Sequence, residues 1–321
     1  MTRLAIMLLA VCGCDRTPPR ERAIAEVKQI LTRDVDALVT SARALRDAAP
    51  RAPWQAEDLA RMRAHWAEAR DAYERIEGAV ATLFAHLDRS VDGRYDAFVE
   101  LAPDDDLFDG EGVTGMHAVE RILWANAHPA ETVRFESALS GYVPARVPAN
   151  ADEASRFRDG LVGRLVSDCE QMQRDLAPLA LDPAAAYRGV MGSIEEQVEK
   201  VMLAATGEDE SRYSRRTLAD MRANLAGGRA IFAAIEPWLK SVDGEDEVRR
   251  VHAAFDELER AYSGSSDALP PVPEGWNPDR PNEDTPYGRL FMIVSHHADP
   301  DADGAFGAMR DAAQKLGIAV L

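Results

Sequence analysis

A regular seam of apolar residues between residues 56 and 87 constrains the fold of this chain more than any other feature. Its members recur at steps of seven, three, four, three and four, and they are Trp66, Tyr73, Ile76, Val80, Leu83 and Leu87. This spacing is typical of residues that share one face of an α-helix and pack against neighbouring helices. The seam therefore predicts a long helix from about residue 56 to 87 that belongs to a helical bundle.

Helical periodicity continues through most of the chain. Residues 21–48 carry apolar positions at helical steps, and Pro50 and Pro53 end that pattern. No alternation of strands and helices occurs, which favours an all-α, bilobal fold of two tandem antiparallel four-helix-type bundles. The remaining helices are predicted over residues 153–179, 183–205, 213–240, 245–262, 287–297 and 303–316, with loops over residues 101–115 and 263–286.

A proline-rich stretch from Val143 to Pro148 separates two halves of the chain. We place the N-terminal bundle at residues 14–150 and the C-terminal bundle at residues 151–321. The 13 residues that precede them are interpreted as a signal peptide.

The first 14 residues have the pattern of a secretory leader. Arg3 provides a positively charged start, and residues 4–11 form an apolar run that is too short for a transmembrane helix. The run leads into Cys12-Gly13-Cys14, which resembles a bacterial lipobox with Cys14 as the lipidated residue. We therefore expect a periplasmic lipoprotein that is anchored to a bacterial membrane through Cys14. Cys169, in an amphipathic helical pattern, is then left without a disulfide partner and is expected to be buried.

The chain is strongly acidic, with 55 Asp and Glu against 37 Lys and Arg and a formal net charge of −18. Such a surface repels nucleic acid and raises the local concentration of cations. We therefore expect no nucleic-acid partner and consider metal ions as ligands.

The segment from Gly115 to Trp124 carries the clearest candidate ligands. If this segment is helical, His117 and Glu120 share a face, with Cβ atoms ~5–6 Å apart. An imidazole and a carboxylate at this spacing can hold one metal ion from a rigid element. The same pair can also form a hydrogen bond at the edge of a core, and two ligands alone do not define a metal site.

Further acidic residues fall at positions that face the interior of the predicted bundle. Glu77 lies on the flank of the apolar seam, and Glu74 lies one turn before it. A carboxylate near a core needs a partner, because burying it unpaired costs several kcal/mol. A metal ion, an arginine or an outward bend of the side chain to solvent would each serve. Asp92 lies where this helix ends, and Glu199, in a later acidic cluster, can point back at the first half.

Known hydrolase and calcium motifs do not fit the chain. Arg121 breaks the inverted zincin pattern His-x-x-Glu-His, and the ordinary His-Glu-x-x-His pattern is absent from the sequence. The run from Asp299 to Gly304 resembles the start of an EF-hand loop, but Arg310 stands where a bidentate Glu is required. The sequence also lacks a Gly-x-Ser-x-Gly elbow and a glycine-rich phosphate loop.

Three stretches resemble the imelysin-like family, in particular its EfeO-type branch: the His-x-x-Glu segment at His117, residues 68–77, and residues 206–224. The resemblance implies two four-helix bundles and a periplasmic protein of iron acquisition. We expect no cupredoxin-like domain before the first bundle, as in the shorter, stand-alone members of the family. Carried over from the family, the metal site would combine the following residues: His117, Glu120, Glu77, Glu74, Asp92 and Glu199.

The resemblance implies an extracytoplasmic lipoprotein that captures iron for uptake, with copper and zinc as alternative metals. An iron permease and a peroxidase-type protein are the partners that it suggests. We expect a binding protein rather than an enzyme. The first alternative is a lipoprotein that binds a polysaccharide or another ligand without metal. The second is an imelysin-like metallopeptidase, which would need an open metal position and a general base.

Overall fold

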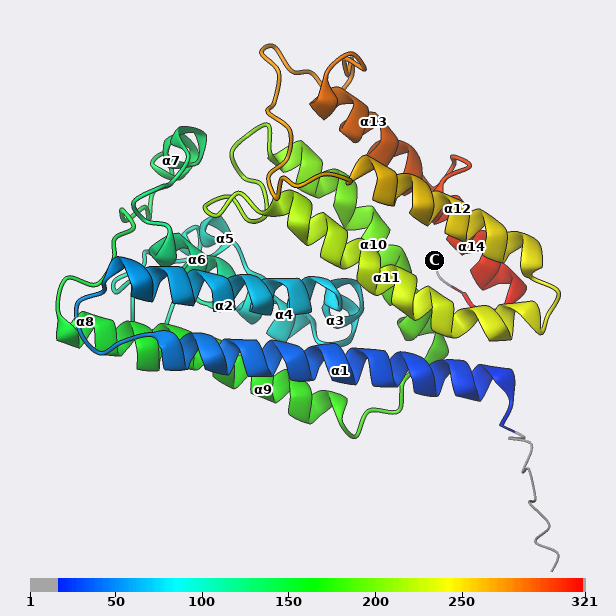
Figure 1. Ribbon diagram of the computed structural model, residues 1–321, viewed down its shortest axis with the longest axis horizontal. Coiled ribbons are helices and arrows are strands. Elements are labelled where there is room, and N and C mark those ends of the chain that lie inside the picture. Colours follow the sequence, from blue (N-terminus) through cyan, green and yellow to red (C-terminus); the bar gives the residue numbers. More distant parts are fainter. Residues whose placement is uncertain (1–16, 320–321) are drawn as a thin grey trace, which may run out of the picture.

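The computed structural model describes residues 17–319, and helices are the only regular elements in that range (Figure 1). The predicted all-α fold is confirmed. The elements are α1 (Pro19–Ala48), α2 (Ala56–Glu74), α3 (Glu77–Leu83), α4 (Ala85–Asp92), α5 (Tyr95–Val99), α6 (Gly115–Leu123), α7 (Ala130–Glu136), α8 (Ala151–Arg156), the π-helical turn η1 (Phe157–Leu161), α9 (Val162–Leu176), α10 (Pro183–Leu203), α11 (Thr217–Lys240), α12 (Glu245–Ala261), α13 (Pro286–Ala298) and α14 (Ala305–Lys315).

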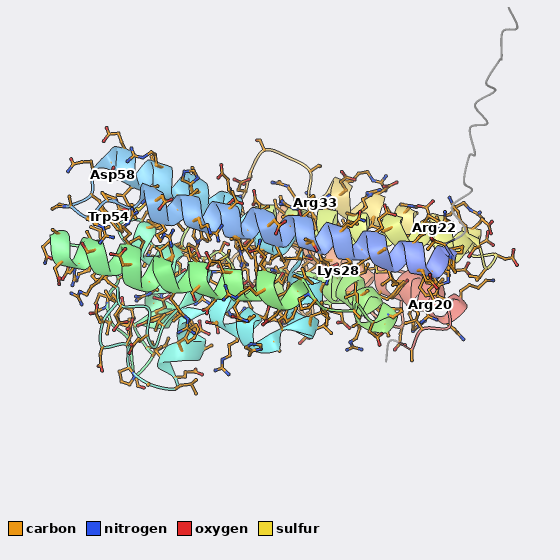
Figure 2. All side chains as sticks on the ribbon, turned by 90° about the horizontal axis from the view of Figure 1, so that it is seen from below. Arg20, Arg22, Lys28, Arg33, Trp54 and Asp58 are labelled. Atoms are coloured by element: carbon orange, nitrogen blue, oxygen red, sulfur yellow. The ribbon has the colours of Figure 1, made fainter. Side chains whose placement is uncertain are left out.

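The N-terminal bundle is built along α1, which lies beside α2 and α9 (Figures 1 and 2). Its apolar face is fully buried at positions such as Val27 and Leu38. Lys28, labelled in Figure 2, donates from Nζ to the carbonyl oxygen of Leu179 at 2.8 Å and also to that of Leu176. A cation at the carboxyl end of α9 satisfies free carbonyl groups and complements the helix dipole.

The second bundle contains α10 and α11 together with α12, α13 and α14 (Figure 1). Helix α10 packs against α3 and α11, and α11 also packs against α1 and α2. The hydrophobic core is therefore continuous from one bundle to the other.

Helix α9 follows the predicted boundary at residue 150 but packs against α1, α4 and α6 of the N-terminal bundle. The chain thus returns to the first bundle before α10 enters the second. The division of the chain into domains by residue number stays a prediction.

The single helix predicted over residues 56–87 is wrong, because the structure breaks it after Glu74 and again at Phe84. At the first break the amide of Ile76 donates to the carbonyl of Tyr73 at 2.9 Å, which tightens the turn. The backbone of Arg75 there lies so close to α11 that a Cβ at Gly227 would be 2.6 Å from the Arg75 carbonyl carbon. The break therefore depends on tertiary packing.

The amino end of α6 is fixed against the end of α4 by Gly115. Its φ of +89° is a left-handed conformation that favours glycine, and a Cβ there would lie 2.7 Å from the carbonyl oxygen of Ser90. The hydroxyl of Thr114 donates to the same oxygen at 3.2 Å. This close approach brings the helix that carries His117 next to Asp92, the last residue of α4.

Cys169 is buried and unpaired, as predicted. Cys14 lies outside the described residues. Within residues 17–319, no helix combines the length and the apolar character that crossing a membrane requires.

Candidate metal centre

A buried cluster of charged side chains, with Arg70 at its centre, lies where α2, α3, α4, α6, α10 and α11 meet the loop before α11. The Arg70 side chain is fully buried and forms ion pairs with Glu74 and Asp92. Its Nη2 lies 3.0 Å from Oε1 of Glu210, and its Nε lies 3.5 Å from Oδ2 of Asp220. Four carboxylates from three helices and a loop therefore share one guanidinium group.

His117 lies beside this arginine cluster and is 1 % exposed. Its Nδ1 is 3.0 Å from Oε2 of Glu120, at the i,i+3 spacing that the sequence predicted. Its Nε2 is 3.1 Å from Oε1 of Glu210 and 3.3 Å from Oδ1 of Asp92. Both ring nitrogens thus face carboxylate oxygens.

Glu120 is held in place by the backbone as well as by the imidazole. Its Oε1 accepts hydrogen bonds from the amides of Tyr213 at 3.2 Å and Ser214 at 2.7 Å. Its Oε2 faces His117. The carboxylate therefore links α6 to the loop that precedes α11 and fixes the orientation of the ring.

Lys200 occupies the other side of the cluster. Its Nζ lies 3.1 Å from both carboxylate oxygens of Glu74, and 2.9 Å and 3.3 Å from those of Glu77. The side-chain amide of Asn224 donates to Glu77 at 2.7 Å. The ammonium group is buried and serves as the counter-ion for these two glutamates.

The cluster carries more negative than positive charge. It contains six carboxylates but two permanent cations, Arg70 and Lys200, which leaves an excess of four negative charges when all six are ionised. Burial raises the pKa of Glu74 to about 8, although Arg70 opposes the shift, and burial raises the pKa of Asp220 to about 7. The excess charge therefore requires protons or an added cation.

Around His117 the charged forms are favoured. Burial and Arg70 act to lower the pKa of His117, but hydrogen bonds to Asp92, Glu120 and Glu210 outweigh them and raise it. Burial also acts to raise the pKa of Glu210, but Lys200, His117 and Arg70 outweigh it, so the pKa is lowered well below its usual value. Glu210 therefore stays ionised in spite of its burial.

A surface pocket of ≈ 320 Å³ leads to these residues. Glu77, Asp92, Lys200 and Glu210 form part of its lining. The rest of its lining is mostly charged and comprises Asp88, Arg89, Gly93, Arg94, Ala97, Glu196 and Glu199. The cluster is therefore accessible from one side, through a pocket that attracts cations.

The structure brings together most of the residues predicted from the sequence. His117, Glu120 and Asp92 converge, and Glu74 and Glu77 lie on the Lys200 side of the same cluster. Glu199 is not among them: its side chain is 59 % exposed at the mouth of the pocket and pairs with Arg94. Within residues 17–319, two sets of side chains have ligand atoms close enough to hold an ion, Asp92–His117–Glu210 and Glu74–Glu77–Glu210. Which residues act as ligands stays a prediction.

Sequence reasoning missed Glu210, Arg70, Lys200 and Asp220 as members of the cluster. Glu210, Arg70 and Asp220 lie within stretches that resemble the imelysin-like family, so a closer comparison of those stretches was the available signal. Lys200 lies on the long helix α10, and no spacing rule connects it to residue 117. Only the tertiary fold places Lys200 in the cluster.

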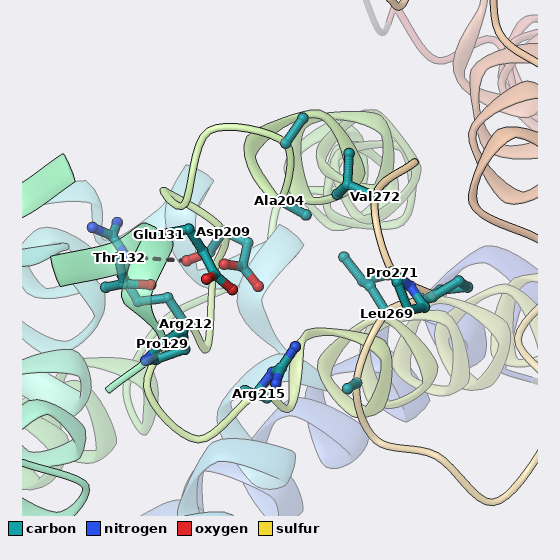
Figure 3. A pocket seen from close by; sticks show the side chains of 13 residues that line it. Pro129, Glu131, Thr132, Ala204, Asp209, Arg212, Arg215, Leu269, Pro271 and Val272 are labelled. Carbon is teal, nitrogen blue, oxygen red and sulfur yellow. Dashed lines mark hydrogen bonds between the residues drawn. The ribbon is translucent and has the colours of Figure 1, made fainter. Parts of the chain in front are cut away.

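A second pocket of ≈ 320 Å³ lies between the start of α7, the loop before α11 and residues 268–272 (Figure 3). Asp209 lines it, although this residue is next to Glu210 in sequence, and accepts a hydrogen bond from the hydroxyl of Thr217 at 2.8 Å. Glu131 and Arg215 line the same pocket. The adjacent residues Asp209 and Glu210 thus line two different pockets.

Comparison with known proteins shows which family this chain resembles. The sequence pattern of one family, Imelysin, matches residues 23–283. The iron uptake system component EfeO of Yersinia pseudotuberculosis serotype I (strain IP32953) is 30% identical over 257 residues, which are 78% of this chain and 57% of the relative. The protein of the same name from Escherichia coli (strain UTI89 / UPEC) is 29% identical over 223 residues, 70% of this chain and 48% of the relative.

The chain spans about half the length of these curated relatives. An imelysin-like protein from Psychrobacter arcticum 273-4, known from its crystal structure, has the same fold, with a TM-score of 0.60 and 12% sequence identity. The alignment covers 94% of this chain and 98% of that one. Because the family pattern covers most of the sequence, the chain belongs to the imelysin family.

Proposed function

We propose that this protein captures iron outside the cytoplasm for uptake, and that it binds the ion between Asp92, His117 and Glu210. Two kinds of observation support the proposal. Relatives that share about 30% identity are named iron uptake system components. The buried cluster combines an excess of carboxylates with one imidazole, and these donors suit iron.

The observation that carries the proposal is the surroundings of His117 Nε2. Two carboxylate oxygens, from Glu210 and Asp92, lie 3.1 and 3.3 Å from this nitrogen. Ligand atoms that are ~2.1 Å from an ion and ~90° apart are separated by ~3.0 Å. An ion that replaces the Nε2 proton can therefore reach both oxygens. Asp92 Oδ1 and Glu210 Oε1 also pair with Arg70, so the proposal requires this guanidinium to move away from them when the ion binds.

In this proposal Glu120 orients the imidazole. A metal-bound histidine usually donates its other N–H group to a carboxylate, which fixes the tautomer and the ring plane. Oε2 of Glu120 lies 3.0 Å from Nδ1 of His117 and can accept this hydrogen bond. Its other oxygen, Oε1, accepts hydrogen bonds from two backbone amides. Glu74 and Glu77 hold Lys200 and supply negative charge nearby.

The proposal is tested by metal binding to the purified protein and its variants. We expect the wild type to bind one iron ion, measured by elemental analysis and by anaerobic titration with ferrous iron. His117→Ala should lose more affinity than the ~10–100-fold that is typical of outer-shell changes, and Glu120→Gln should fall within that range. Unchanged stoichiometry and affinity in His117→Ala would remove the assignment.

A matched control is Glu170→Gln. Glu170 lies on α9 and pairs with Arg43 at the surface, with Nη2 and Oε1 2.7 Å apart. This variant removes one negative charge from the protein without touching the cluster. It should bind iron like the wild type, and circular dichroism should show that all variants remain helical. Titrations with copper and zinc test the alternative metals, which by the Irving–Williams order can bind more tightly than ferrous iron.

The same variants separate the two alternative functions. A lipoprotein that binds a polysaccharide or another ligand without metal would retain no ion when purified. A metallopeptidase would turn over a protein substrate and lose that activity in Glu120→Ala. Delivery of iron to a permease and cooperation with a peroxidase-type protein are further parts of the proposal and rest on the family resemblance. The names of the relatives describe them as components of an iron uptake system.

We also propose that the protein is a periplasmic lipoprotein anchored through Cys14. The support is the leader-like pattern of residues 1–14. Metabolic labelling with a radioactive fatty acid should mark the wild type, and Cys14→Ser should abolish the label. A labelled Cys14→Ser protein would contradict the anchor.

A further inference from the structure

We infer that Arg94 acts as a gate for cations that enter the buried cluster: its guanidinium covers Glu210, and an entering cation displaces it. The inference rests on the proposed metal-binding function. Arg94 directly precedes α5 and lines the pocket that leads to the cluster. Its guanidinium lies between two carboxylates, with Nη2 3.4 Å from Oε1 of Glu199 and Nη1 3.7 Å from Oε2 of Glu210.

These two carboxylates lie at opposite ends of the path. The side chain of Glu199 is 59 % exposed and that of Glu210 is 9 % exposed. Neither contact of Arg94 is short, and its own side chain is 28 % exposed, whereas Arg70 is fully buried. An arginine held loosely between an outer and an inner acid can move from one to the other at small cost.

The two oxygens of Glu210 have different surroundings. Oε1 lies 3.0 Å from Arg70 and 3.1 Å from His117, inside the cluster. Oε2 lies 3.7 Å from Arg94 and 3.9 Å from Lys200. Because Arg94 and Glu210 both line the pocket, an entering cation meets Glu210 where Arg94 covers it and competes with the guanidinium for this carboxylate.

The pocket supplies the cation and a place for the displaced arginine. Asp88, Asp92, Glu196 and Glu199 line it and raise the local concentration of cations. When the cation binds Glu210, Arg94 retains Glu199 as its partner at the mouth. In this inference Glu199 is not a metal ligand. It is the partner that stabilises Arg94 in its displaced position.

The inference is tested by the rate of ion binding. Rapid mixing with ferrous iron under anaerobic conditions can be followed by tryptophan fluorescence, because the Trp66 indole donates to the carbonyl of Met116, next to His117. Arg94→Ala should bind about fivefold faster than the wild type at low salt, since a competing cation has been removed. Arg94→Lys keeps the charge and should stay within about twofold of the wild type.

Arg89→Ala is the matched control. Arg89 lines the same pocket, and within residues 17–319 it forms no ion pair with a carboxylate. Its removal changes the charge of the pocket by the same amount and should raise the rate by less than about twofold, an effect that added salt suppresses. Glu199→Gln should slow binding, because the open position of Arg94 loses its partner.

The outcomes separate the gate from the function. A faster rate in Arg94→Ala than in Arg89→Ala, with one ion still bound, supports the gate. Equal rates in these two variants, or a slower rate in Arg94→Ala, overturn the gate while iron binding by the wild type stands. If Arg94→Lys binds iron as fast as Arg94→Ala does, the positive charge at residue 94 does not compete with the cation for Glu210. A wild-type protein that binds no iron overturns the proposed function and the gate together.

Discussion

The two sides of the buried cluster contain similar acids but differ in their resident cations. On one side, Glu74 and Glu77 enclose the ammonium group of Lys200, with four N–O distances between 2.9 and 3.3 Å. On the other side, Asp92 and Glu210 face Nε2 of His117. Lysine holds its proton firmly, whereas an imidazole can exchange its proton for a metal ion. The comparison teaches that the resident cation, more than the number of carboxylates, distinguishes a structural charge cluster from a metal site.

We expect the largest effect on stability from a substitution of Lys200. Lys200→Met leaves Glu74 and Glu77 buried without their counter-ion, and loss of one partner of a buried pair costs about 3–5 kcal/mol. Urea denaturation should show this loss in the free energy of unfolding. Lys240→Met is the control, because Lys240 pairs with Glu236 at the surface and should change stability by less than about 1 kcal/mol. Equal stability of the two variants would show that Lys200 is not the essential counter-ion.

The next prediction compares ligands on the two sides. Glu210→Gln should weaken iron binding by about 100-fold, equivalent to about 2.7 kcal/mol, because it removes a charged donor next to His117 Nε2. Glu77→Gln keeps hydrogen-bonding groups near Lys200 and Asn224 and should bind iron much as the wild type does. Isothermal titration calorimetry measures both. A larger loss in Glu77→Gln than in Glu210→Gln would move the metal to the Lys200 side.

A smaller effect tests how the helices position the Lys200 side. A Cβ at Gly189 of α10 would lie 2.7 Å from Cα of Ala79 in α3, two residues after Glu77. Gly189→Ala should therefore cost about 1–3 kcal/mol of stability through overpacking. Gly163→Ala in α9 is the control, because its Cβ would meet only the Arg158 carbonyl at 3.7 Å and the helix should gain up to about 1 kcal/mol. Thermal unfolding that ranks the two variants in the opposite order would contradict this packing.

The smallest effect concerns the mouth of the pocket. Glu199→Gln should leave the equilibrium affinity for iron within about twofold, because an exposed charge is screened and pairs weakly. Calorimetry of this variant checks whether Glu199 is a ligand, as the family resemblance implied. A 10-fold or larger loss would restore it to the ligand set.

Local pattern sufficed for most of the long helices and for the His117–Glu120 pair, since both depend on spacing along one helix. The break after Glu74 could not be predicted, because no proline or glycine marks it and it arises from packing against Gly227 of α11. Glu210 lies 93 residues from His117, with α10 between them, so only the tertiary fold joins them. Arg70 and Lys200 were missed for a related reason: a sequence does not show which cation neutralises which buried acid.

The most direct test of the central claim is anomalous X-ray diffraction at the iron absorption edge from crystals of the iron-loaded protein. Our account predicts one strong peak ~2.0–2.3 Å from Nε2 of His117, between the carboxylates of Asp92 and Glu210. A peak between Glu74 and Glu77 with Lys200 displaced, or no ordered iron in the cluster, would contradict it.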